Sequence, residues 1–544
     1  MLLAIATLII VPFLTFFLST TLFYRKTKNK FPGQTPPTTP YFVPGVFHAF
    51  SLAYFGPQKY FAALIDQYGN FAPFVVKAGL GSFLVLRDPK QAERVLQASN
   101  QLTTRKSNLH IHERLFGSPK EILKFYAGKG SNGNEAGLVE LVHSALPRKY
   151  LMGTSLAPLI DTYVSILSRN LNEKMFQVGF WTQIEDFWSF LQQVIARCTI
   201  ETLFGREIIK QYPSIVKDYL TFADAAASFV PGMPRFLASA TYEGPRDRLH
   251  EGIAKWLKAT HSGSEFAKID EEDPVWDEDK GSKFIQERDD VFAKTEGVDL
   301  KGRAAEVLSV MHGSNSSLLP SAFWTLVEVL RKPQLGKHIA AEISQHYSPQ
   351  AGEYDVASIT ETPFIQSVQT EVRRLRVPTV ATRTNEVDNF QLDEQWTLPR
   401  GMTVMLFSHD ISLHTKFWAK ARPRTVERPL EEFWAERFLL PNRATSSAKS
   451  SKPAKDKIEA GNFSMEGLES LDLVLGGNDD QCLGRDYMRA VHAATLAVFL
   501  NEFDLQLCDT DEVDAAIPPV REDAYGTVKP LYPVAVRIRK RRMG

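Results

Sequence analysis

Cysteine is scarce in this chain, which has 544 residues and only three cysteines. So sparse and odd a set excludes a disulfide-stapled secreted scaffold and is typical of a chain that folds in a reducing compartment. A surplus of charge of one sign is also absent, because 63 Lys and Arg residues balance 63 Asp and Glu residues. Without a basic surplus the chain has no electrostatic attraction for polyanions, so we exclude a nucleic-acid-binding role. No internal repeat is evident, which excludes solenoids and propellers.

The composition that remains is that of a large globular protein. Hydrophobic residues make up 44% of the chain and charged residues 23%, which excludes disordered and fibrous classes. Apolar residues recur with helical spacing through most of the chain, as in residues 158–175 and 188–204. Short β-type runs occupy residues 74–79, 83–88, 396–408 and 532–541. We therefore predict a mainly α (α+β) fold, a large helical domain with a small β-rich region, and surface loops in the charged stretch 262–302 and the stretch 442–470.

The amino-terminal segment is the longest apolar run. Residues 2–24 contain no charge and are long enough to cross a hydrocarbon layer of roughly 30 Å as a helix. A basic flank follows them, and Lys and Arg residues next to a membrane span favour the cytosolic side. We therefore expect the rest of the chain to lie in the cytosol. We predict a transmembrane anchor over residues 1–24, a basic flank and proline-rich hinge over 25–45, and one cytosolic body over 46–544. A buried helix of a soluble protein is the alternative for the anchor.

Cys482 is the strongest candidate for chemistry. It follows a glycine-containing turn and directly precedes a long helix of apolar periodicity. Backbone amides at a helix start lower a thiol pKa and can donate to a thiolate, as an axial ligand of haem iron requires. Gly476 and Gly477 allow the close backbone approach that a flat macrocycle needs. An inert buried cysteine is the alternative when this feature is taken alone.

Further motifs add to this feature. Glu371 and Arg374 stand three residues apart, so they share one helix face and can pair. Arg437, in the segment EEFWAERF, can supply a second cation to the same carboxylate. In this order, ahead of the cysteine loop, these residues resemble the cytochrome P-450 superfamily of haem-thiolate enzymes, microsomal type. The resemblance matches Glu371, Arg374 and Arg437 to the family's structural triad, and Cys482 with Gly484 to its ligand loop.

The resemblance implies haem b with an axial thiolate from Cys482 in a catalytic domain over residues 46–544. It also implies cations for the haem propionates. The ligand loop departs from the family at Leu475, Asn478 and Asp480, and an ionised Asp480 cannot donate to a propionate. That role therefore falls to other residues. Arg383 resembles the family's propionate-binding arginine, and His143 and Arg148 are further candidates.

The segment LSVMHGSNSSLLPSAFW lies where the family's central helix crosses the haem, and Pro320 should kink it. The acid and threonine that relay protons in many members are replaced by Ser316 and Ser317 when the segment is aligned with the sterol 7-hydroxylase and prostacyclin synthase branch. A hydroxyl can donate a hydrogen bond and order water, so both serines are candidate catalytic residues. Relief of backbone strain at the kink is the alternative.

These features predict a membrane-anchored monooxygenase that inserts one oxygen atom of O2 into a lipophilic small molecule, a sterol, terpenoid, polyketide or similar compound. The family implies electrons from an NADPH-dependent flavoprotein reductase or cytochrome b5, a single-pass location in the endoplasmic reticulum membrane and a cytosolic catalytic domain. Divergent motifs and polar insertions suggest a fungal enzyme of secondary metabolism. The alternatives are a haem-thiolate isomerase or dehydratase that acts on a peroxide without O2 or reductase, and a non-catalytic haem-binding protein.

Overall fold

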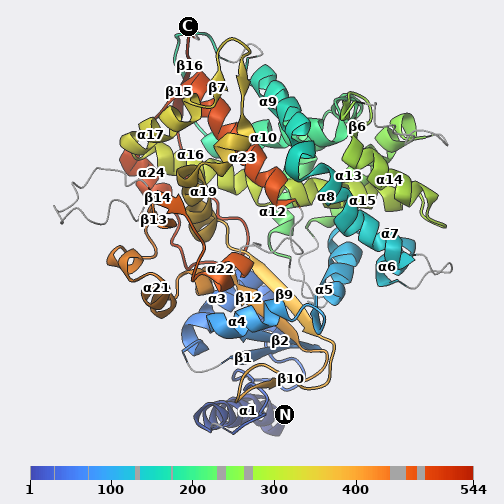
Figure 1. Ribbon diagram of the computed structural model, residues 1–544. Helices are drawn as coiled ribbons and strands as arrows, with labels where there is room; N and C mark the ends of the chain where they lie inside the picture. The colour runs from blue at the N-terminus through green and yellow to red at the C-terminus, as the bar shows by residue number, and fades with distance from the viewer. Residues whose placement is uncertain are drawn as a thin grey trace.

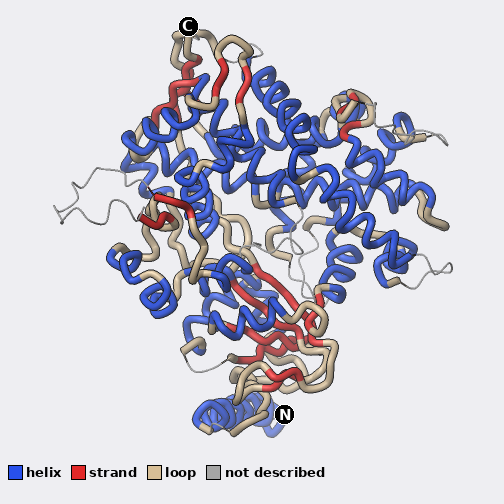
Figure 2. The backbone as a smooth tube through the Cα atoms, viewed as in Figure 1, coloured by secondary structure: helices blue, strands red, loops and turns tan. Residues whose placement is uncertain are grey.

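The computed structural model describes residues 2–29, 31–70, 73–128, 135–172, 176–229, 241–262, 274–441, 461–474 and 484–542. Helices fill most of the upper part of the molecule, and the larger sheet lies in the lower part (Figures 1 and 2). The small sheet formed by β4, β15 and β16 lies at the opposite edge. This arrangement confirms the predicted mainly helical fold with a separate β-rich region.

The bounds of the elements fix this arrangement. The α-helices are α1 (Leu2–Lys28), α2 (Ala49–Phe55), α3 (Pro57–Tyr68), α4 (Pro89–Gln97), α5 (Arg105–His110), α6 (Lys120–Ala127), α7 (Glu135–Glu140), α8 (Leu146–Tyr150), α9 (Ala157–Asn172), α10 (Phe187–Phe204), α11 (Glu207–Gln211), α12 (Ile215–Ala226), α13 (Glu243–Thr260), α14 (Lys283–Lys294), α15 (Leu300–Asn315), α16 (Leu318–Leu330), α17 (Pro333–Ser344), α18 (Val356–Glu361), α19 (Pro363–Arg376), α20 (Ser408–Ser412), α21 (Thr415–Ala421), α22 (Glu469–Val474), α23 (Arg485–Glu502) and α24 (Thr510–Ala516). Two π-helical segments, η1 (Ile111–Leu115) and η2 (Leu141–Ala145), and two 3₁₀ turns, η3 (Gly153–Leu156) and η5 (Pro423–Glu427), complete the helical elements of the described residues. The strands are β1 (Phe74–Ala78), β2 (Gly81–Leu86), β3 (Leu102–Thr103), β4 (Thr182–Ile184), β5 (Trp276–Asp277), β6 (Gly281–Ser282), β7 (Tyr347–Ser348), β8 (Glu353–Tyr354), β9 (Val380–Asn385), β10 (Phe390–Gln391), β11 (Thr397–Leu398), β12 (Thr403–Phe407), β13 (Leu439–Pro441), β14 (Gly461–Phe463), β15 (Phe503–Leu507) and β16 (Val536–Lys540).

The five-stranded sheet has the order β1-β2-β12-β9-β3 and shows the period of two that the sequence predicts. Phe74 and Val76 belong to the hydrophobic cluster that includes residues of α2 and α3, whereas Val75 belongs to the cluster that includes residues of α4. Because successive side chains point to opposite faces, both faces of the sheet are buried. The sheet joins strands from the first hundred residues to strands β9 and β12, about three hundred residues later in the chain.

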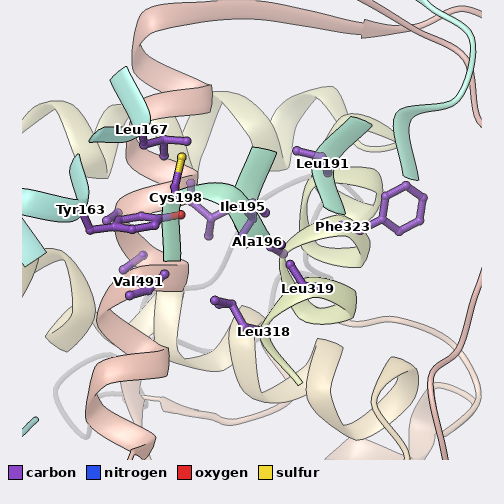
Figure 3. Packing of buried hydrophobic residues seen from close by; sticks show 14 of the residues in the cluster. Tyr163, Leu167, Leu191, Ile195, Ala196, Cys198, Leu318, Leu319, Phe323 and Val491 are labelled. Atoms are coloured by element: carbon purple, nitrogen blue, oxygen red, sulfur yellow. The ribbon is translucent and has the colours of Figure 1, made fainter. Parts of the chain in front are cut away.

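The main core lies where α9, α10, α16 and α23 meet (Figure 3). Cys198 of α10 lies in this core beside Tyr163 and Leu167 of α9 and has no exposed surface. Burial raises the pKa of the Cys198 thiol well above its usual range, which keeps this sulfur protonated and unreactive. Cys198 is therefore a packing residue.

Helix α1 contacts the body of the protein. Ser19 donates a hydrogen bond to the carbonyl oxygen of Tyr41 and accepts one from its amide, and the ring of Phe16 stacks on Phe42 at 4.5 Å. Phe23 is buried against Tyr68 of α3. Among the helices of the described residues, none is long and apolar enough to cross a membrane, so the anchor predicted over residues 1–24 is not confirmed.

The surface loop predicted over residues 262–302 is wrong for residues 283–294 and 300–302, which are helical, whereas residues 263–273 lie outside the described residues. Residues 442–460 of the other predicted loop also lie outside them. The charged stretch 262–302 includes the helix α14, whose residues Phe284 and Phe292 are buried. Two charges of α14 are buried with partners: Arg288 binds Glu306 at 2.9 Å and Asp289 binds Arg303 at 2.6 Å. Both partners lie on α15, so these two buried charges belong to a contact between two helices and not to a solvated loop.

Candidate functional site

The central helix is interrupted where the sequence predicts a distortion. Helix α15 ends at Asn315, and α16 begins at Leu318. Pro320 has no amide hydrogen, and its ring clashes with the carbonyl of Ser316 in a continuous helix, so the helix breaks at that point. Asn315 stabilises the break because its side-chain oxygen accepts a hydrogen bond of 2.6 Å from Thr199 of α10 and its amide donates to the carbonyl of Met311.

A cavity of about 400 Å³, which we call the central cavity, lies beside the last two turns of α15. Ser309, Val310 and Gly313 of α15 line it on one side, and Gly484 and Tyr487 line it at the start of α23. The cavity is thus placed between the central helix and the helix that follows the Cys482 segment. The predicted distal helix and the predicted helix after the cysteine therefore border the same cavity.

The two glycines of this cavity border open space. A Cβ atom added at Gly313 or at Gly484 would meet no atom within 4 Å. A glycine inside a helix costs about 1 kcal/mol relative to alanine, so Gly313 lowers the stability of α15. Open space over glycines on two elements suits a flat macrocycle, so these residues fit haem b.

The π-helical segments η1 and η2 supply another wall of the central cavity through His112 and His143. Single π-turns occur frequently at functional sites. His143 has accessible surface and lines the cavity. Protein atoms nevertheless lie densely around its imidazole. Burial, assisted by the neighbouring Arg288, lowers the pKa of His143 to about 4, so its imidazole is neutral near pH 7 and can donate one N–H to an oxygen.

A buried carboxylate ties the segments of this wall together. Glu306 of α15 accepts hydrogen bonds from Tyr126 at 2.6 Å and from Arg288 at 2.9 Å, and lies 3.4 Å from the imidazole Nδ1 of His112. Arg288 also donates to the carbonyl of Val142 in η2. Burial alone would raise the pKa of Glu306, but His112 and Arg288 overcome it and hold this pKa at about 2. The cavity wall therefore rests on an ionised carboxylate.

The predicted ion triad is assembled. Arg374 donates two hydrogen bonds to the Glu371 carboxylate, at 2.6 and 2.8 Å, and Arg437 donates a third at 2.9 Å. None of the three side chains has exposed surface. Burial would raise the pKa of Glu371, but the two guanidinium groups overcome it and hold this pKa below its usual value.

The triad also reaches the segment between α20 and β13. Arg374 donates to the carbonyls of Ser412 and Leu430, and Arg437 donates to those of Thr425, Pro429 and Glu432. Each of these backbone groups precedes the cysteine region in the chain. The triad thus fixes the approach of this segment to α19, where a buried charge without such partners would be strongly destabilising.

Other predicted residues lie away from the central cavity. Arg383 is a buried residue of β9 whose guanidinium donates to the carbonyl of Thr382 at 2.9 Å, and burial lowers its pKa. Arg148 is an exposed residue of α8. Ser316 and Ser317 line a smaller cavity of about 150 Å³, which shares His312 with the central cavity.

Cys482, Gly476 and Gly477 lie outside the described residues, as do Leu475, Asn478 and Asp480. Of the two described cysteines, Cys198 belongs to the helical core and Cys508 follows β15, and neither lines the central cavity.

Sequence reasoning missed the central-cavity residues Ser309, Gly313 and His112. Gly313 could have been recognised from the sequence, because a glycine inside an apolar helix often indicates close packing or a functional site. His112 carried none, since it reaches the cavity only through the contacts of η1 with α15.

Comparisons with known proteins agree with this geometry. A sequence profile for Cytochrome P450 matches residues 36–451. The cytochrome P450 monooxygenase efuG of Hormonema carpetanum is 27% identical over 532 residues, which cover 95% of this chain and 92% of that protein. The cytochrome P450 monooxygenase fsoE of Humicola fuscoatra is 26% identical and covers 95% of this chain and 90% of its own length. Rabbit (Oryctolagus cuniculus) cytochrome P450 7A1 is 21% identical over 70% of each chain.

These matches extend from the proline-rich segment through the helical body, and they include Glu371, Arg374 and Arg437 of the triad. The relatives include two fungal monooxygenases, as the divergent motifs and polar insertions suggested, and the mammalian cytochrome P450 7A1. The chain therefore belongs to the cytochrome P450 family, as a monooxygenase whose cofactor is haem b with a cysteine thiolate as its axial ligand.

Proposed function

We propose that this protein inserts one oxygen atom of O2 into a lipophilic small molecule, a sterol, terpenoid, polyketide or related compound of fungal secondary metabolism. The observation that carries the proposal is the central cavity between α15 and α23, with open space at Gly313 and Gly484. When bound there, haem b supplies the activation of dioxygen.

Cys482 holds the haem in this proposal. It stands two residues before Gly484, which caps α23 at the central cavity. Glu371, Arg374 and Arg437 act as a structural triad that holds the preceding segment in place, and no part of the triad touches substrate. Gly476 and Gly477 give the cysteine segment the backbone freedom to approach the cofactor.

Ser316 and Ser317 are the proposed proton-relay residues. They lie in the turn between α15 and α16, within about one helical turn of Gly313, and His312 lines both their cavity and the central cavity. Each hydroxyl can donate one hydrogen bond and accept others, which orders water and moves a proton toward the central cavity.

Arg383, His143 and Arg148 are the proposed partners of the haem propionates. His143 is supported by its place on the cavity wall and by its neutral imidazole, which donates a hydrogen bond without a full charge. Arg383 and Arg148 rest on the resemblance in sequence alone.

Electrons come, in this proposal, from NADPH through a separate flavoprotein reductase or cytochrome b5. We also propose attachment to the endoplasmic reticulum membrane through the amino-terminal segment, with the catalytic domain in the cytosol. Phe13, Phe17 and Leu22 of α1 are each more than half exposed, at 67%, 66% and 59%. Apolar side chains so exposed along one helix are typical of contact with a lipid surface.

The test supplies candidate sterols, terpenoids and polyketides to the haem-loaded protein with a reductase, NADPH and ¹⁸O₂. We expect one ¹⁸O atom in the product and no product without NADPH. Conversion of an organic hydroperoxide itself into an isomer or a dehydration product, without NADPH and without oxygen transfer to a second molecule, would instead identify an isomerase or dehydratase. A substrate-induced spin change without product under any electron supply would identify a non-catalytic haem protein.

A further inference from the structure

A second and larger cavity lies beside the α5–η1 segment. Its volume is about 1060 Å³, and it is bordered by α5, α6, the β1–β2 hairpin and the turn before β12. Five of the side chains that line it are cationic: Arg105 and Lys106 of α5, Lys120 and Lys124 of α6, and Arg400. We call it the cationic cavity.

The cationic charge of this cavity is not neutralised within the described part of the chain. Only two anionic residues line it, Glu113 and Glu386, and Glu386 accepts a hydrogen bond of 2.6 Å from Thr103. None of the five cations has a carboxylate within 4.0 Å among the described residues, and Arg105 donates to the backbone carbonyl of Ala127. In a chain whose charges balance at 63 and 63, this local surplus of cations stands out.

Apolar side chains share the cavity with these cations. Leu109 and Leu123 line it from two helices, Met402 lines it beside the sheet, and Leu80 lies fully exposed at the hairpin. A site that combines apolar walls with a few charged groups selects an amphipathic ligand, because the apolar body gains burial and the charged groups fix its orientation.

One helix separates this cavity from the central cavity. Lys106 and Glu113 face the cationic cavity, whereas Asn108 and His112 of the same segment line the central cavity. Since an α-helix with its side chains is about 10 Å across, the two cavities are neighbours.

We propose that the cationic cavity binds the anionic group of an amphipathic substrate, a lipophilic molecule that carries a carboxylate, sulfate or phosphate. This inference rests on the proposed function and narrows its substrate class. An anionic lipid headgroup offers the same chemistry, so the test separates a free amphiphile from a membrane.

The experiment titrates the full-length, haem-loaded protein with decanoate and with methyl decanoate by calorimetry at low salt. The two ligands differ by one charge and little in volume. We expect decanoate to bind about tenfold more tightly than the ester, because a small number of partly exposed ion pairs supplies this difference. The variant Lys106→Glu/Arg400→Glu should lose that preference, whereas Lys90→Glu, a charge reversal at an exposed lysine of α4, should keep it.

Absence of decanoate binding, equal affinity for acid and ester, or an unchanged preference in Lys106→Glu/Arg400→Glu overturns the proposal. The neutral variant Lys106→Gln/Arg400→Gln covers the case in which charge reversal impairs folding, and it should lie between the two. If Lys106→Glu/Arg400→Glu binds phosphatidylserine vesicles more weakly than wild type but binds decanoate equally well, the cavity contacts a membrane and the proposal of an anionic substrate is rejected. The carbon-monoxide spectrum of each variant, which is independent of this cavity, shows whether the haem site and the proposed function stand.

Discussion

Replacing Glu371 with glutamine tests the central ion triad. The change keeps the size and shape of the side chain but removes the carboxylate that Arg374 and Arg437 share. Removing one partner of a buried ion pair costs about 3–5 kcal/mol, because the other charge stays buried without compensation. Backbone carbonyls still accept hydrogen bonds from both guanidinium groups, so we expect the lower end, about 3 kcal/mol, in the free energy of unfolding.

The assay is urea unfolding of the haem-loaded protein, with the carbon-monoxide spectrum as a second readout of the cysteine segment. Glu361→Gln is the matched control on α18, because Glu361 is 71% exposed and lies 3.7 Å from its partner Arg489. We expect it to cost less than about 1 kcal/mol. A Glu371→Gln variant within about 1 kcal/mol of wild type would refute the assignment of the triad as a structural support.

Three further changes address the cavity walls and the relay. Gly313→Phe should fold but lose haem, because its ring occupies the open space of the central cavity, whereas Gly137→Phe, also at an open helical glycine, should retain haem; equal haem content by pyridine haemochrome contradicts the placement of the cofactor. The Glu306 pKa of about 2 lies below its unfolded value, so its contribution to stability is present above pH ~4.3 and is lost as pH falls toward 2. Glu306→Gln should therefore flatten the acid limb of a stability–pH curve, and an identical acid limb in both proteins would show that the carboxylate is not stabilising. Ser316→Ala/Ser317→Ala should lower the yield of product per NADPH by at least about tenfold, with more hydrogen peroxide, and an unchanged yield rejects the relay.

The sequence predicted what depends on local pattern. The alternation in Phe74, Val75 and Val76 predicted a strand, and the spacing of Glu371 and Arg374 predicted their pairing. Residue patterns with a fixed period determine which face is buried, so such predictions need no knowledge of distant contacts.

What depends on tertiary contacts was not predicted from local pattern. Arg437 lies 66 residues from Glu371 in the chain, so no local spacing predicts their contact. The need of a buried carboxylate for a second cation and the family resemblance indicated it. We predicted a loop in place of helix α14 because a charge-rich segment usually faces solvent. Arg288 and Asp289 are instead buried against charges on α15. The wall of the central cavity was missed because His112 reaches it only after η1 packs against Glu306.

The most direct test of Cys482 as the haem ligand is the absorbance spectrum of the reduced, carbon-monoxide-bound protein for wild type, Cys482→Ala and Cys198→Ala. We expect the strongly red-shifted band of thiolate-ligated haem in wild type and in Cys198→Ala, because the Cys198 sulfur is buried in the helical core. We expect loss of that band in Cys482→Ala. Retention of the band in Cys482→Ala, or its loss in Cys198→Ala with the fold intact, would contradict the assignment of Cys482 as the haem ligand.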